Sequence, residues 1–131
     1  MVSVKLVTKI VLGVLFIAAG ANHFINPAFY ENIMPPYLPW HYALVIISGV
    51  AEVVLGVGLL IPKTSRYAAW GLILLLIAIF PANIHMAAHP ELYPNIPPIA
   101  LWIRLPIQLL LILWAYWYTR RSNRIYESFR R

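Results

Sequence analysis

Four long apolar stretches dominate the pattern of hydrophobic and polar positions along the chain, and short segments rich in proline and polar residues separate them. The stretches run near residues 4–25, 41–61, 66–88 and 98–119. Each reaches the roughly 20 residues that an α-helix needs to cross a bilayer. Because short connections make consecutive helices run in opposite directions, the pattern predicts one all-α membrane domain over residues 1–131, folded as an up-down bundle of four transmembrane helices.

Composition supports the membrane class. Hydrophobic residues make up 62% of the 131 residues, which is too apolar for a soluble domain of this size. The chain has no cysteine, so thiolate metal sites and iron–sulfur clusters are excluded, and any redox chemistry must belong to a bound cofactor. The first stretch, with Lys5 and Lys9 near its start and Ala19-Gly20-Ala21 near its end, resembles a signal peptide, but we expect an uncleaved helix.

Basic residues mark one side of the predicted bundle. Arg104 lies inside the fourth stretch, and the other lysines and arginines are Lys5, Lys9, Lys63, Arg66, Arg120, Arg121, Arg124, Arg130 and Arg131. The positive-inside rule places this side in the cytoplasm, so we expect cytoplasmic termini and a basic tail over residues 120–131. The net charge of +6 then reflects anchoring on anionic lipid, and no groove-reading element indicates nucleic-acid binding.

Aromatic residues agree with this orientation, because tryptophan and tyrosine gather at membrane interfaces. The predicted outer belt contains Tyr37, Trp40, Tyr42, Tyr93 and Trp102, and the inner belt contains Tyr67, Trp70, Trp114, Trp117 and Tyr118.

Small residues repeat at a helical spacing in the first two spans. Gly13 and Gly20 lie seven residues apart, as do Gly49 and Gly56, and seven residues return to nearly the same face of a helix. Each span therefore presents a small-residue stripe for close packing, either as an ordinary helix contact or as the trace of a duplicated hairpin.

The second and fourth spans each contain one charged residue. Glu52 falls near the middle of the second span, where a lone carboxylate is costly and needs a partner from the protein interior. Arg104 in the fourth span is the predicted partner, and Gln108, one turn deeper, would complete the hydrogen bonds. The pair would either fix the helix register or form the floor of a ligand site or a proton-accepting group.

Amide and histidine pairs close two other spans on the outer side: Asn22 with His23, and Asn83 with His85. They would either cap and solvate the helix ends or join the charged residues in one polar cavity. Pro81 frees a backbone carbonyl near Ile77 that neighbouring polar groups would satisfy.

Two cofactor interpretations also compete for the histidines. His23 and His85 could ligate a haem, although nothing in the sequence demands it, and a zinc site using Glu91 lacks a compact metal motif. We therefore predict no metal site and disfavour haem.

The first connection, residues 26–40, is rich in proline and aromatic residues. This composition suits a segment that lies in the outer interface, either as a simple re-entry or as a lid over the bundle.

Four segments, one in each span, carry a family resemblance. They are Gly20-Ala21-Asn22-His23-Phe24 with Pro27, Ile47-Ser48-Gly49-Val50-Ala51-Glu52 with Leu55-Gly56, Phe80-Pro81-Ala82-Asn83-Ile84, and Leu101-Trp102-Ile103-Arg104-Leu105-Pro106-Ile107-Gln108. With them the chain resembles the DoxX-like family of four-helix bacterial integral membrane proteins. The resemblance implies an inner-membrane location and, from some relatives, an association with quinone-linked sulfur oxidation or redox-stress complexes. Other similar proteins are assembly factors or receptor chaperones without catalysis.

The predicted function is therefore a binding or accessory subunit for a quinone or other lipophilic molecule in a membrane redox system. The candidate site residues are Asn22, His23, Glu52, Asn83, His85, Arg104 and Gln108. The sequence assigns no catalytic residues. The alternative is a non-catalytic chaperone or assembly factor whose small-residue faces and Pro-rich loop dock another membrane protein or a second copy of the chain.

Overall fold

The structure is a computed structural model that describes residues 3–120, and the predicted tail arginines Arg121, Arg124, Arg130 and Arg131 lie outside this range. The helices are α1 (Val4–Ile25), α2 (Pro27–Ile33), α3 (His41–Leu60), α4 (Ser65–Ala88), the 3-10 helix η1 (Pro90–Leu92) and α5 (Pro98–Trp117). α1, α3, α4 and α5 are long and apolar enough to cross a membrane. The prediction of an all-helical chain with four candidate spans is confirmed, and each span ends within two residues of its predicted limits.

Local chemistry sets several helix ends. The Ser3 side chain accepts a hydrogen bond from the Leu6 amide at 3.1 Å and so caps α1. Pro98 begins α5, where its missing N–H is not needed. Trp40 precedes α3 with φ 53°, a left-handed conformation that reverses the chain out of the first loop. In the α3–α4 turn, Thr64 Oγ1 donates to the Gly58 carbonyl at 2.7 Å and so gives a backbone acceptor in the last turn of α3 a partner.

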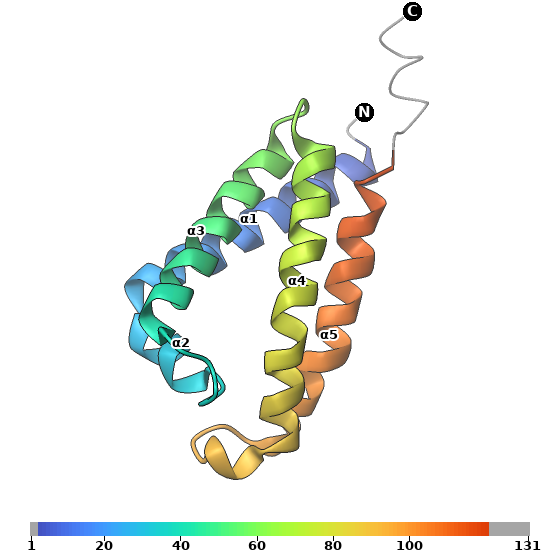
Figure 1. Cartoon of the computed structure of the whole chain (residues 1–131). Coiled ribbons are helices and arrows are strands. Elements are labelled where there is room, and N and C mark those ends of the chain that lie inside the picture. Colours follow the sequence, from blue (N-terminus) through green and yellow to red (C-terminus); the bar gives the residue numbers. More distant parts are fainter. Residues whose placement is uncertain (1–2, 121–131) are drawn as a thin grey trace, which may run out of the picture.

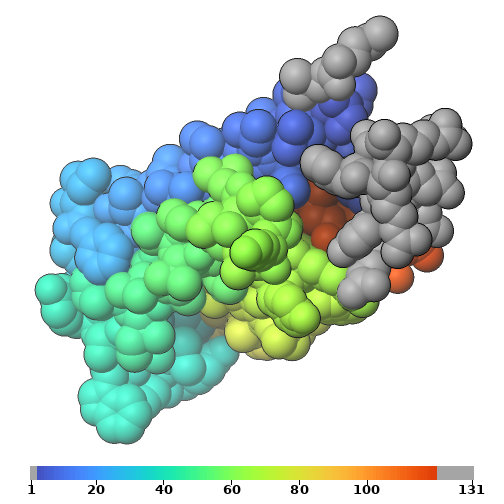
Figure 2. Space-filling view, turned by 90° about the horizontal axis from the view of Figure 1, so that it is seen from above, coloured from blue at the N-terminus to red at the C-terminus, as the bar shows by residue number. Residues whose placement is uncertain are grey.

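The long helices form two pairs. α1 packs against α3, α4 packs against α5, and the pairs are joined mainly between α3 and α4. Figure 1 shows that the pairs meet at the end where α1 begins and α5 ends and diverge toward the end that carries α2 and η1. Figure 2, from above, shows α1 in blue running alongside α3 in green.

The core lies where the pairs meet. Its buried side chains come from all four long helices and from Tyr118, just beyond α5, and are Leu12, Phe16, Leu59, Ala68, Ala69, Leu72, Ile73, Leu76, Ala115 and Tyr118. Many large apolar side chains on the outside remain exposed, including Ile47 at 63%, Leu74 at 66% and Leu113 at 65%. A soluble domain would bury such surface, so these side chains mark the faces that a bilayer covers in a multi-pass membrane protein.

Glycines hold α1 and α3 unusually close. A Cβ on Gly20 would lie 2.6 Å from the Gly49 carbonyl oxygen, and a Cβ on Gly56 would lie 2.8 Å from the Gly13 carbonyl oxygen. The predicted small-residue stripes therefore face each other in an antiparallel pair. The backbones can approach this closely only because these positions have no side chain.

The two ends of the described chain lie side by side. Lys5 Nζ donates to the Arg120 carbonyl at 3.4 Å, and the Tyr118 hydroxyl donates to Thr8 Oγ1 at 2.7 Å. Arg66 Nε also donates to the Thr119 carbonyl at 3.0 Å. The described lysines and arginines other than Arg104 thus gather at one end of the bundle, as the charge pattern predicts.

Replacing Gly20 with alanine tests the α1–α3 contact. We expect Gly20→Ala to lower the free energy of unfolding by roughly 1–3 kcal/mol, because the new methyl group meets the Gly49 backbone, which cannot move aside locally. Gly71→Ala is the matched control, since its Cβ would meet only the end of the Leu55 side chain. Thermal unfolding in detergent measures both variants, and equal stability of the two would contradict the backbone contact.

Candidate functional site

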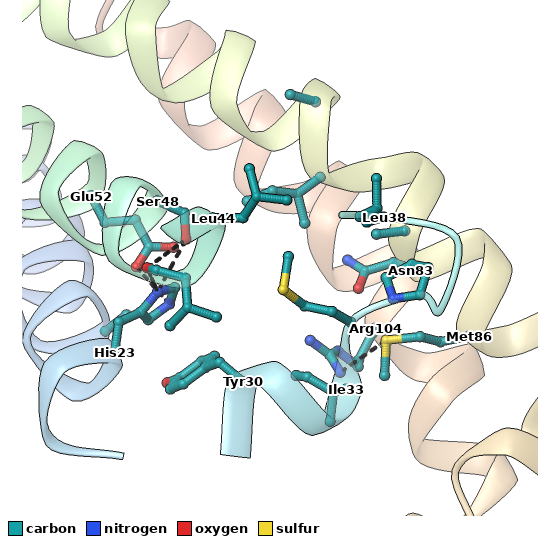
Figure 3. A pocket seen from close by; sticks show the side chains of 17 residues that line it. His23, Tyr30, Ile33, Leu38, Leu44, Ser48, Glu52, Asn83, Met86 and Arg104 are labelled. Atoms are coloured by element: carbon teal, nitrogen blue, oxygen red, sulfur yellow. Dashed lines mark hydrogen bonds and ion pairs between the residues drawn. The ribbon is translucent and has the colours of Figure 1, made fainter. Parts of the chain in front are cut away.

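A cavity of about 450 Å³ lies between the two helix pairs at the end where they diverge. Most of its wall is apolar, and its polar side chains are His23, Tyr30, Ser48, Glu52, Asn83 and Arg104. α2 and the loop after it contribute Tyr30, Ile33, Met34, Pro35 and Leu38, so the predicted Pro-rich segment forms part of the wall. Figure 3 shows open space between His23, Ser48 and Glu52 on one side and Asn83, Met86 and Arg104 on the other.

The first wall contains a histidine–carboxylate pair. His23 Nε2 lies 3.4 Å from Glu52 Oε2, and both side chains are about one-tenth exposed. The other ring nitrogen, His23 Nδ1, lies 3.0 Å from the Val45 carbonyl and 3.2 Å from Ser48 Oγ. The ring is therefore held by hydrogen bonds at Nδ1, and its Nε2 faces Glu52 at the cavity.

The glycines of α1 and α3 position this pair. A Cβ on Gly49 would lie 2.8 Å from the His23 Cβ, so His23 occupies space that any larger residue at position 49 would fill. With the helices this close, the ring at the end of α1 reaches Glu52 in the middle of α3. The packing of the helices thus supplies the partner that a buried carboxylate requires.

The predicted ion pair between Glu52 and Arg104 is wrong. The ion pairs within residues 3–120 are His23–Glu52 and His89–Glu91. Arg104 stands on the opposite wall, where its Nη1 donates to Met86 Sδ at 3.8 Å. Glu52 and Arg104 lie at similar depths along the bundle, but the divergence of the helix pairs separates them across the cavity.

Gln108 has a different role from the predicted one. It joins α5 to α4: Asn83 Nδ2 donates to Gln108 Oε1 at 2.5 Å, and Gln108 Nε2 donates to the Leu76 carbonyl at 2.6 Å. Leu76 lies one residue before Ile77, whose carbonyl loses its helical donor to Pro81. Gln108 therefore bonds the carbonyl next to the one that Pro81 frees, and its side chain is buried and does not line the cavity.

Asn22 supports the cavity from behind. Its Nδ2 donates to the Tyr30 hydroxyl at 2.6 Å, and the Tyr30 ring packs on the His23 ring with centroids 3.9 Å apart. Sequence reasoning missed Tyr30 and Ser48 as site residues. The sequence could have indicated Ser48, because it lies one turn before Glu52 on the same helix face. It could not have indicated Tyr30, because the position of this ring depends on the short helix α2.

His85 lies apart from the cavity. Its ring contacts Tyr37 and His89, with centroid distances of 5.0 and 4.6 Å, and it does not line the space that His23 lines. Nearby, burial raises the pKa of the Tyr93 hydroxyl, and the neighbouring Tyr37 adds to the effect. Across residues 3–120, no three histidine or acidic side chains converge as metal ligands would.

The model of a family described as a domain of unknown function (DUF8561) matches residues 12–119, which is most of the chain. The chain belongs to this family. No curated protein and no solved structure gives a significant match. The matched region contains every residue of the cavity wall and all four glycines of the α1–α3 contact.

A double-mutant cycle tests the link between α4 and α5. We expect Gln108→Leu to lower the free energy of unfolding by roughly 1–3 kcal/mol, because it leaves the Asn83 amide without its partner and removes a hydrogen bond to the Leu76 carbonyl. Asn83→Leu combined with Gln108→Leu should cost less than the sum of the two single changes, since each single change strands the other amide. Thermal unfolding measures all three variants. Strictly additive losses would show that the amides act independently.

Proposed function

We propose that this DUF8561 protein binds a lipophilic molecule with a small polar head group, a quinone-type ring being the leading candidate, in the cavity between its helix pairs. The observation that carries the proposal is a mostly apolar cavity with a cationic donor on one wall and a histidine–carboxylate pair on the other. Charged side chains in membrane spans are costly unless they serve a partner or a ligand. The hydrogen bond described for the Arg104 side chain goes to a sulfur atom, so its other N–H groups can donate to a ligand oxygen.

The size and lining of the cavity support a compact head group. About 450 Å³ falls within the range of small-molecule sites, which are largely apolar with a few placed polar groups. An oxygen of the ring would accept from the Arg104 guanidinium, and apolar residues such as Leu44 and Ile79 would contact the ring and the start of its tail. The motif resemblance to DoxX-like proteins, some of which are linked to quinones, favours the same ligand class.

We further propose that the protein lies in the inner membrane with both termini in the cytoplasm. The lysines and arginines flanking the spans support this orientation, and Lys5, Lys63 and Arg66 stand at the end of the bundle where the described chain begins and ends. Exposed Trp40 and Trp102 belong to the opposite end, as expected for an outer aromatic belt. The cavity then lies in the outer half of the membrane.

The alternative proposal, a non-catalytic chaperone or assembly factor, has less support. A chaperone of this kind would dock its partner on the small-residue faces, but these faces are already packed against each other between α1 and α3. Their glycines are Gly13, Gly20, Gly49 and Gly56. Its remaining argument is the Pro-rich first loop. That loop contributes Met34, Pro35 and Leu38 to the cavity wall, which favours a covering role within the chain.

Ligand retention tests the proposed function. We expect protein purified in lipid nanodiscs to retain a quinone by native mass spectrometry and to bind an added decyl-benzoquinone with a rise in melting temperature. Arg104→Met should weaken this binding about 10- to 100-fold, because hydrogen bonds to charged groups contribute about 1.5–3 kcal/mol. Arg120→Met, at the opposite end of the bundle, is the control and should bind normally. Bulk phospholipid alone, with no stabilisation by the added quinone, would refute the proposal.

A further inference from the structure

Arg104 is a cation without an anionic partner in the part of the chain that the structure describes. A guanidinium stays charged in proteins and carries five N–H donors. The acidic residues described are Glu31, Glu52 and Glu91, and neither of the described ion pairs includes Arg104. Its described hydrogen bond goes to Met86 Sδ at 3.8 Å, and a thioether is a weak acceptor. The positive charge of Arg104 is therefore not balanced by the surrounding protein.

The place of Arg104 in the fold makes an unbalanced charge costly. The residue lies inside α5, which is apolar enough to span a membrane, so the lipid around this helix cannot solvate the charge. Its guanidinium lines the cavity, together with apolar side chains such as Ile33 and Met34. A cation in a space of low polarity attracts an anion more strongly than it would in water. An anion inside the cavity would therefore gain more from Arg104 than a neutral molecule would.

Glu52 lies across the cavity and does not supply this anion. Its Oε2 atom is fully buried, lies 3.4 Å from His23 Nε2 and makes no hydrogen bond within residues 3–120. Figure 3 shows open space between this pair and Arg104. A negatively charged ligand group is thus attracted to the Arg104 wall and not to the Glu52 wall. This difference fixes which way the ligand lies, with its charged end against Arg104.

We infer that the head group of the ligand is an anion held by Arg104, so that the cavity takes a lipophilic acid: one negatively charged oxygen group on an apolar ring or chain. This inference rests on the proposed function and names the charge of its ligand. A guanidinium pairs well with a carboxylate or an ionised ring hydroxyl, because charge-assisted hydrogen bonds are roughly twice as strong as neutral ones. A neutral quinone offers only carbonyl oxygens, so it is the weaker ligand.

Two ring compounds of matched shape test the charge selection. The first is a decyl-hydroxynaphthoquinone, whose ring hydroxyl is ionised at neutral pH, and the second is its neutral methyl ether. We expect the wild-type protein in phosphatidylcholine nanodiscs to bind the acid at least about 10-fold more tightly than the ether, after subtraction of the signal from protein-free nanodiscs. Dodecanoate, an acid without a ring, should compete with the hydroxynaphthoquinone.

The failures of the two proposals are distinguishable in this experiment. Equal affinities for the acid and the ether would overturn the charge selection and leave the proposed function standing. Failure of every probe to bind would overturn both. Binding of dodecanoate without binding of either ring compound would support the charge selection and overturn the quinone-type ring as the leading candidate.

Arg104→Met assigns the selection to this residue. We expect the variant to reduce the preference for the acid over the ether to about 2-fold or less, because the acid loses its opposite charge. Arg120→Met, at the other end of the bundle, is the control and should keep the wild-type preference. An unchanged preference in folded Arg104→Met would overturn the assignment. The comparison of the two ring compounds on the wild-type protein does not depend on the folding of any variant.

An acidic phospholipid presents the same charge chemistry as a free acid, and native mass spectrometry separates the two sources. The wild-type protein is released from nanodiscs of phosphatidylcholine mixed with phosphatidylglycerol. Retained phosphatidylglycerol that the hydroxynaphthoquinone displaces would support the anion site and identify a phospholipid as its source. Displacement of a retained free acid would support the site with a free lipophilic acid as the source. Retained phosphatidylcholine that the acid fails to displace would overturn the inference.

Discussion

The close approach of α1 and α3 at Gly20 and Gly49 is the contact on which the site depends. Without Cβ atoms at these positions, the two backbones come near enough for His23 to lie against Glu52. A wider spacing would leave the carboxylate without a partner in a medium that cannot solvate it. The same contact that stabilises the helix pair therefore also gives the buried Glu52 carboxyl group a neighbour at the cavity.

The second helix pair depends on a different interaction. α4 and α5 are joined by the Asn83–Gln108 hydrogen bond and by the bond from Gln108 to the Leu76 carbonyl, near the interruption that Pro81 makes in α4. Because each pair has its own internal contacts, the pairs can diverge without losing them. The cavity is the result, and it is closed in part by α2 and its following loop.

The polar residues of the spans thus divide into three roles. His23, Ser48 and Glu52 line one wall of the cavity. Asn83 and Arg104 line the other wall. Asn22 and Gln108 do not line the cavity, and each makes a hydrogen bond to a residue that does. His85 joins an aromatic contact near the α4 end. The cavity thus has a histidine–glutamate pair on one wall and an arginine on the other, which a count of polar residues does not reveal.

The sequence by itself determined the spans, because hydropathy and helix length are properties of single segments. It also identified the glycine stripes, since a seven-residue spacing fixes which residues share a helix face, and it gave most of the polar residues of the cavity. It did not determine which polar groups meet. Glu52 pairs with His23 rather than Arg104 because the rotation and separation of the helices depend on packing summed over the whole bundle. Tyr30 entered the site for the same reason, as only the folded position of α2 brings its ring onto His23.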